Sequence, residues 1–263
     1  YKEDGTGIMS AIVHLGGGTG EFVSDNGLIL TNHHVAFGAI QRASDAENDY
    51  IKHGFLAETY AREIPAQGYI ANVLLGYEDV TDIILADVKP GMDLEKRDDV
   101  IQEAIETLSE KEEAEGPDIR VRVASMYEGN QYYLFRFKHL QDIRLVYARP
   151  NSLGNFGGDI DNWMWPRHTC DFSFLRAYVS PDGEGAAYSE ENVPYKPKSV
   201  LKISLDGLDE GDFTFVMGYP GRTYRNYMYR EVEAEFDRMK QSIESRKETI
   251  AFLEEAGEGD RSV

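Results

Sequence analysis

The sequence contains one cysteine, Cys170, so no disulfide can form within the chain and cysteine usage indicates no compartment. It has no uninterrupted apolar run close to the ~20 residues that a membrane helix needs. Basic residues are few, because 27 Lys and Arg stand against 47 Asp and Glu and give a net charge of −20. Such a surface repels phosphate backbones. We therefore expect a globular protein with no membrane span and no nucleic-acid partner.

Three kinds of site are also missing from the sequence. Neither Gly-x-Ser-x-Gly nor Gly-Asn-Ser-Gly occurs, and Ser152, the best of the loop serines, precedes Asp171, whereas a trypsin-like Ser follows its Asp. We therefore assign Ser152 a structural role. The run 16–20 lacks the Lys and the following helix of a phosphate loop. Cys170 has only His168 and Asp171 nearby, so the sequence predicts neither a metal nor a cofactor.

Hydrophobic patterning predicts mostly short strands with two long helices. A helix is expected from 93 to about 115, and a second from about 229 to 257. Residues 45–63 are expected to be helical or irregular, and 154–167 to form a long loop. The expected strands are 10–14, 20–24, 28–31, 70–75, 80–86, 119–126, 132–138, 143–147, 171–179, 200–204 and 213–217.

The last helix carries apolar residues at a heptad-like spacing, from Val232 and Phe236 to Ile250 and Leu253. It is either a C-terminal helix docked on the preceding domain or the start of a helical domain that is cut off, and the second interpretation is preferred. The sequence therefore predicts two domains, 1–228 and 229–263.

The clearest functional pattern is the run Thr31-Asn32-His33-His34-Val35, which follows a predicted hairpin. The turn Asp25-Asn26-Gly27 separates two short strands of this hairpin, and Asn-Gly is a strong hairpin signal. A trypsin-like β-barrel delivers its general base at such a strand end, three residues after a Thr. His34 is therefore the predicted base. The alternative is a pair of loop histidines that cap the following turn.

Asp171 opens another strand-like run and is the predicted acid that orients the imidazole of His34. The alternative is a strand-end cap. The loop 157–169, just upstream, contains both tryptophans of the chain beside Asn162. Such a loop suits a polar pocket with apolar walls. The alternative, at least as good for Trp165, is a loop that its aromatics pin to the core.

Three motifs carry a resemblance to a known family. They are Ser-Asp-Asn-Gly-Leu-Ile-Leu-Thr-Asn-His-His, Gly-Gly-Asp-Ile-Asp-Asn-Trp-Met-Trp-Pro-Arg-His-Thr-Cys-Asp-Phe-Ser and Phe-Val-Met-Gly-Tyr-Pro-Gly-Arg-Thr-Tyr. With them the chain resembles, over nearly its whole length, the bacterial dipeptidyl peptidase 7 and 11 family of serine exopeptidases, serine peptidase family forty-six.

The resemblance implies a fold that is mostly β with α: a chymotrypsin-like double β-barrel, interrupted by a helical domain that starts here. It implies His34 as base, Asp171 as orienting acid, and Asn162 and Trp163 as ligands of the substrate's free α-amino group. The nucleophilic Ser is expected after the helical domain, so the chain is expected to be an N-terminal portion and inactive alone.

The function that follows is a serine dipeptidyl aminopeptidase whose substrates are peptides with a free N-terminus. A periplasmic or cell-surface location and a homodimer of the complete enzyme are expected from the same resemblance. Two alternatives stay open. Thr-Asn-x-His-Val also fits an HtrA-like endopeptidase, although the loop with Asn162 and Trp163 argues against it. The absent Ser also fits a peptide-binding pseudo-protease.

Overall fold

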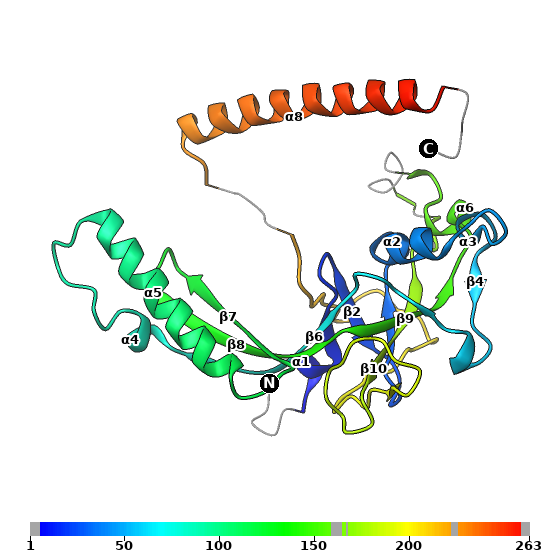
Figure 1. The fold of residues 1–263 in the computed structure, drawn as a ribbon, viewed down its shortest axis with the longest axis horizontal. Coiled ribbons are helices and arrows are strands. Elements are labelled where there is room, and N and C mark those ends of the chain that lie inside the picture. Colours follow the sequence, from blue (N-terminus) through cyan, green and yellow to red (C-terminus); the bar gives the residue numbers. More distant parts are fainter. Residues whose placement is uncertain (1–5, 159–164, 167, 222–225, 259–263) are drawn as a thin grey trace. The chain divides into compact units, whose positions relative to one another are not determined.

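The computed structural model describes residues 6–158, 165–166, 168–221 and 226–258. Asn162 and Trp163 lie outside these ranges. The chain divides into two compact units, Tyr1–Pro220 and Gly221–Val263. Figure 1 shows the elements of both units, which are described separately below.

The first unit is built on one antiparallel sheet, to which eleven strands contribute in the described residues. Its main path runs β4-β9-β10-β3-β2-β1-β6-β8-β7, while β11 pairs with β10 and β5 pairs with β9. The strands are β1 (Ile12–His14), β2 (Thr19–Phe22), β3 (Leu28–Thr31), β4 (Phe55–Leu56), β5 (Ile64–Pro65), β6 (Ala71–Asp79), β7 (Ile119–Met126), β8 (Gln131–Leu140), β9 (Asp142–Ala148), β10 (Ser173–Val179) and β11 (Val193–Pro194).

The helices of the first unit are mostly short; α1 precedes β1, and the others lie between strands in the chain. They are α1 (Ile8–Ala11), α2 (His33–Ala43), α3 (Tyr50–His53), the 3₁₀ turn η1 (Tyr60–Arg62), α4 (Thr81–Ile84), α5 (Leu94–Glu113) and α6 (Asn151–Gly154). The predicted mixture of a mostly antiparallel sheet with helices is confirmed. The chymotrypsin-like double barrel stays a prediction.

The main hydrophobic core lies where strands from distant parts of the sheet path meet α2. Leu175 of β10, Leu145 of β9 and Val73 of β6 share this core with Ile40 of α2. β10 and β8 approach each other although four strands separate them along the sheet path, so the sheet curls. This curled core is the support on which the ends of β3 and β10 are held.

A buried ion pair ties the hairpin turn to this core. Arg176 donates to Glu63 Oε1 over 2.9 Å and to the main-chain oxygen of Asn26 over 2.7 Å. Tyr178 donates to the other carboxylate oxygen of Glu63 over 2.8 Å. Since both charges are buried, each needs these partners to offset its loss of hydration.

A second, smaller core lies where β7 and β8 extend beyond the first. Ile101 and Leu108 of α5 pack there with Leu134 of β8 and Ile84 of α4. The helix predicted from 93 is therefore confirmed: Asp93 caps it by accepting from the backbone N–H of Glu95 over 3.1 Å. Its apolar stripe packs against the strands, as its helical period predicts.

The second unit contains α8 (Tyr229–Ala256). Glu231 accepts a hydrogen bond from the backbone N–H of Met228 over 2.7 Å, which satisfies a free donor at the helix start. The predicted helix is confirmed, and its apolar residues, Val232, Phe236 and Leu253 among them, are exposed in the structure. The division into domains 1–228 and 229–263 stays a prediction.

Three strand predictions are wrong. Residues 80–86 form α4 and a turn, because Val80 and Ile84 bury together against α5 at helical spacing. Residues 200–204 and 213–217 are apolar but form no strand. A strand needs a neighbour for its backbone groups, and no described strand pairs with either segment.

Candidate active site

The hairpin of β2 and β3 delivers the Thr-Asn-His-His run to the rim of the sheet. Gly27 closes its turn with a φ of 73°, and a Cβ there would lie 2.7 Å from the main-chain oxygen of Ala177. Glycine is therefore required by both conformation and space. At the other end, Thr31 donates its hydroxyl to the main-chain oxygen of Thr19 over 2.7 Å. The strand end that precedes the histidines is thus fixed.

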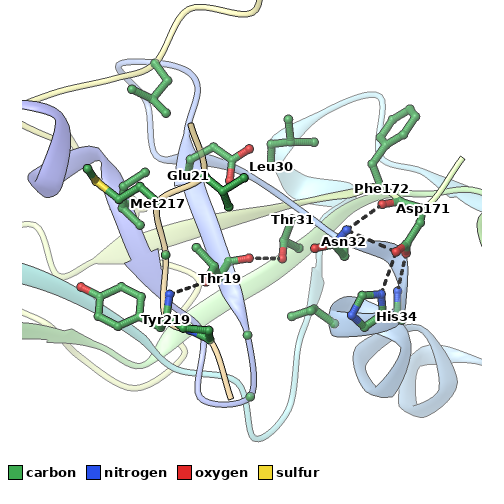
Figure 2. Close-up of a pocket in the computed structure, with 18 of the residues that line it drawn as sticks. Thr19, Glu21, Leu30, Thr31, Asn32, His34, Asp171, Phe172, Met217 and Tyr219 are labelled. Atoms are coloured by element: carbon green, nitrogen blue, oxygen red, sulfur yellow. Dashed lines mark hydrogen bonds and ion pairs between the residues drawn. The ribbon is translucent and has the colours of Figure 1, made fainter. Parts of the chain in front are cut away.

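Antiparallel pairing of β3 with β10 brings Asp171 to the same rim. Ser173 stands opposite Thr31 in this register, so the residues before β10 meet those after β3. Asp171 Oδ2 lies 2.7 Å from His34 Nδ1, and Oδ1 accepts the backbone N–H of His34 over 2.9 Å. Asn32 adds a third donor, over 3.2 Å to Oδ2. Figure 2 shows these contacts converging on the carboxylate.

This geometry specifies the chemical state of the His34 ring. An ionised carboxylate only accepts hydrogen bonds, so the nitrogen that faces Asp171, Nδ1, carries the hydrogen. Nε2 is then the basic nitrogen. The side chain of His34 is 66% exposed and that of Asp171 is 22% exposed. A proton can therefore reach Nε2 while the carboxylate that orients the ring stays largely shielded.

His33 has the opposite environment, although it precedes His34 directly. The residue is 1% exposed, and its Nδ1 lies 3.3 Å from Ser173 Oγ. Burial lowers the pKa of the ring below its ordinary value. The structure therefore brings His34, and not His33, to Asp171.

Two cavities adjoin this pair. The larger, a groove of about 830 Å³, is lined by residues of β2 and β3 and by Leu201 and Phe215–Pro220. The smaller, of about 170 Å³, is lined by Gly154, Asn155, Phe156, Gly158 and Thr169. His34 and Asp171 line both cavities, so the two cavities share this pair.

The sequence reasoning missed two residues of the larger groove. Glu21 of β2 lines it, and burial raises the pKa of this carboxyl group. Tyr219 lines it as well, and its backbone N–H donates to Thr19 Oγ1 over 2.8 Å. Figure 2 labels both side chains, together with Met217 on the same segment. The alternation of Thr19 and Glu21 along β2 was the available signal, since residues two apart in a strand share a face.

The tryptophan-rich loop is described only in part. Asn162 and Trp163 lie outside the described residues, so their predicted role is untested. The chain enters the loop from α6 and returns to Asp171 through Thr169 and Cys170, and Cys170 donates its backbone N–H to the main-chain oxygen of Leu153 over 3.0 Å. Trp165 is 88% exposed and therefore does not pin the loop to the core.

Neither cavity contains an evident nucleophile in the part of the chain that is described. Their described lining residues include no Ser and no Cys, and Ser152 is exposed on α6. In the same residues no group of His, Cys, Asp and Glu side chains is arranged to hold a metal ion. Every described helix is too short or too polar to cross a bilayer.

Known proteins resemble the chain over most of its length. The family model described as Peptidase S46 matches residues 1–263. An Asp/Glu-specific dipeptidyl-peptidase of Porphyromonas gingivalis is 41% identical over 239 residues, which cover 89% of this chain and 33% of that protein. A dipeptidyl-peptidase 7 of Phocaeicola vulgatus is 42% identical over 240 residues, with 89% and 33% covered.

A solved structure is also similar to this chain. The crystal structure of Porphyromonas endodontalis DPP11 in complex with substrate superposes with a TM-score of 0.78 at 39% identity. The match covers 89% of this chain and 35% of that chain. The chain thus spans about a third of the length of the curated relatives that it matches.

Proposed function

Because the chain belongs to the peptidase S46 family, we propose that it carries the His-Asp part of the catalytic machinery of a serine dipeptidyl aminopeptidase. The observation that carries the proposal is the contact of 2.7 Å between His34 Nδ1 and Asp171 Oδ2, at the junction of two cavities. Two relatives that each match 89% of this chain are named dipeptidyl peptidases. The proposed substrates are peptides with a free N-terminus.

In the proposed reaction, a Ser outside these 263 residues attacks the carbonyl carbon of the second peptide bond from the N-terminus. His34 Nε2 takes the hydroxyl proton and then gives it to the leaving amine. Asp171 stays ionised and stabilises the imidazolium that forms between these steps. Water, deprotonated by His34, hydrolyses the acyl-enzyme, releases the dipeptide and restores the Ser.

The free amino group is proposed to bind at the loop that carries Asn162 and Trp163. A buried ammonium needs acceptors, and the amide oxygen of Asn162 can accept from it while the indole of Trp163 offers a cation–π face. Gly158 and Thr169 of the same loop line the cavity of about 170 Å³ beside His34. This supports placing the amino-terminal part of the peptide there.

The finer fold assignment belongs to the same proposal. Residues 1–228 are proposed to supply the first barrel and part of the second barrel of a chymotrypsin-like enzyme, and 229–263 to begin a helical domain. The curled antiparallel sheet supports a barrel. A periplasmic or cell-surface location and a homodimer of the complete enzyme are proposed from the family resemblance.

The proposal is tested with the product of the whole reading frame that contains these residues. Purified protein is assayed against matched dipeptidyl fluorogenic substrates with a free or an acetylated N-terminus. We expect turnover only of the free substrates, and we expect none from the 263-residue chain alone. Cleavage of acetylated peptides at a similar rate would favour an HtrA-like endopeptidase instead.

A peptide-binding pseudo-protease is the second candidate, favoured by the lack of Ser and Cys among the described residues that line the cavities. A fluorophosphonate distinguishes the two candidates, because it labels a serine only when a base activates it. Labelling of the whole product that is lost in His34→Ala supports the peptidase. Peptide binding without labelling supports the pseudo-protease.

A further inference from the structure

His33 lies between the two elements that flank the proposed catalytic pair. It begins α2, directly before His34, and its Nδ1 faces Ser173 Oγ at 3.3 Å, two residues after Asp171. Because burial keeps its pKa low, the ring is neutral near pH 7. In the neutral tautomer that carries its hydrogen at Nε2, the ring accepts the Ser173 hydroxyl at Nδ1.

One face of the ring lies against α6. A Cβ on Gly154 would lie 2.5 to 2.7 Å from three atoms of the His33 ring, so the backbone of this turn rests directly on the imidazole. Neither His33 Nε2 nor Asn151 Oδ1 has a well-aligned hydrogen-bond partner among the described residues. The Asn151 side chain nevertheless interacts with the ring and favours its protonated form, against the effect of burial.

The turn that rests on His33 carries one wall of the smaller cavity. Leu153 accepts the backbone N–H of Cys170 over 3.0 Å, and Gly154 accepts the hydroxyl of Thr169 over 3.1 Å. The outgoing and returning segments of the loop are therefore joined just above the ring. Gly154 and Thr169 line the cavity of about 170 Å³ together with His34 and Asp171.

We propose that His33 is a positioning residue: through Ser173 and Gly154 it holds the wall of this cavity in place relative to His34 and Asp171. The inference rests on the proposed function, since the cavity is where the amino-terminal part of the peptide is proposed to bind. His34 is oriented by Asp171 and not by His33. Loss of His33 should therefore disturb the substrate more than the catalytic pair.

The consequence for kinetics follows from geometry. A substrate misplaced by about 1 Å can lose roughly 100-fold in rate, even when the reacting groups are intact. A small fluorophosphonate makes few contacts with the cavity wall and needs only an activated serine. The two reagents therefore report separately on the wall and on the catalytic pair.

The test uses His33→Ala in the product of the whole reading frame, assayed with a free dipeptidyl substrate and with a fluorophosphonate. We expect a higher KM and a fall in kcat/KM of about 10-fold or more, with a labelling rate close to that of the unmodified protein. His33→Asn should recover part of the loss, because its amide oxygen can accept from Ser173 near the position of Nδ1. Leu134→Ala in the second core is the control for destabilisation, with unchanged kcat/KM expected.

Gly154→Ala tests the same contact from the other side, since its methyl group would meet the ring. It should lower kcat/KM without slowing labelling, and its effect should shrink in the His33→Ala background. If His33→Ala does not fold, Gly154→Ala and Ser173→Ala still test the positioning role, because both variants leave His33 in place.

Three results would overturn the positioning role: unchanged kcat/KM in His33→Ala, labelling that falls in parallel with turnover, or His33→Asn no better than His33→Ala. An unmodified protein that neither turns over substrate nor reacts with the fluorophosphonate would instead overturn the proposed function, and the positioning role with it.

Discussion

The groove beside His34 has two walls that are built in different ways. One wall, formed by β3, α2 and the start of β10, is assembled by paired strands and by three hydrogen bonds to the carboxylate of Asp171. The other wall, Leu201 and Phe215–Pro220, contains no strand. Leu205, in the segment between these residues, is 93% exposed, whereas Leu145 under the first wall is fully buried.

The difference shows that contacts among the described residues fix one part of the site much more firmly than the other. The first wall rests on a continuous core, so the His34–Asp171 geometry is supported from below. The second is held by a few hydrogen bonds, such as the one from the Leu201 N–H to Phe22 and the one from the Tyr219 N–H to Thr19. Among its side chains, the ring of Tyr219 packs against His14 and Phe137. Chemistry should therefore depend on the first wall, and stability should depend little on the second.

The largest effect is expected on the assembled wall. In the product of the whole reading frame, His34→Ala and Asp171→Ala should each lower kcat by roughly 10⁴- to 10⁶-fold, because the base and its orienting acid act as one unit. For the same reason the double variant should be little worse than His34→Ala. Steady-state assays with a dipeptidyl substrate measure this.

His53→Ala is the matched control, since His53 is an exposed histidine on α3, and it should keep full activity. A larger loss in His33→Ala than in His34→Ala would contradict the assignment of the base.

The residues of the first wall could be predicted from sequence, but the strand pairing that assembles them could not. The hairpin followed from Asp25-Asn26-Gly27, and the choice of His34 followed from its spacing to Thr31. Asp171, some 140 positions further along the chain, was predicted as the orienting acid because it opens a strand-like run after the Thr-x-x-His pattern, and the structure places it beside His34. The contact depends on the pairing of β3 with β10, for which no local signal in the sequence exists.

Other features needed the structure because they depend on long-range packing. The burial of His33 arises from α6 and β10, which are distant in sequence. Segments 80–86 and 213–217 are both apolar. The first forms a helical turn that packs against α5, whereas the second has no strand partner among the described residues. Short apolar runs do not distinguish these outcomes by composition alone.

The second prediction compares how much the free energy of unfolding depends on the core under the first wall and on the segment between the two parts of the second wall. Leu145→Ala should lower the free energy of unfolding by about 2–5 kcal/mol, because it leaves a cavity in the main core. Leu205→Ala removes the same atoms from an exposed position and should change it by less than about 0.5 kcal/mol. Urea denaturation of the 263-residue chain measures both. Equal losses would mean that the segment between the two parts of the second wall is packed as tightly as the core under the first.

The third prediction concerns the tryptophan-rich loop, which lines the smaller cavity through Gly158 and Thr169. Asn162→Ala should lower kcat/KM for a substrate with a free N-terminus by roughly 10- to 100-fold, because the bound ammonium loses an acceptor. An acetylated substrate lacks that charge and should show no such loss. If both substrates are affected equally, or the preference for free N-termini persists, Asn162 is structural.

The smallest expected effect is on the pH dependence of stability, and it tests the burial of His33 under the first wall. Burial lowers the pKa of His33, His14 and His139 in the folded state. As pH falls below the ordinary histidine value of about 6.5, the unfolded chain takes up protons that the folded chain does not, so stability is lost. Glu21, whose pKa burial raises, acts in the opposite direction because folding favours its protonated form.

Replacing His33 should therefore flatten the decline in stability on acidification. Urea denaturation between about pH 7.5 and about pH 5.5, a range around the histidine value, should give a shallower slope for His33→Gln than for the unmodified chain. The difference should be at most about 1.4 kcal/mol per pH unit, the limit for one proton. Glu21→Gln should instead steepen the decline when the titration is continued toward pH 4.5, the ordinary value for this group, since it removes the opposing group. Parallel slopes for the unmodified chain and His33→Gln would mean that His33 is protonated as readily in the folded state as in the unfolded one. That result would exclude the neutral, buried ring on which its contact with Ser173 depends.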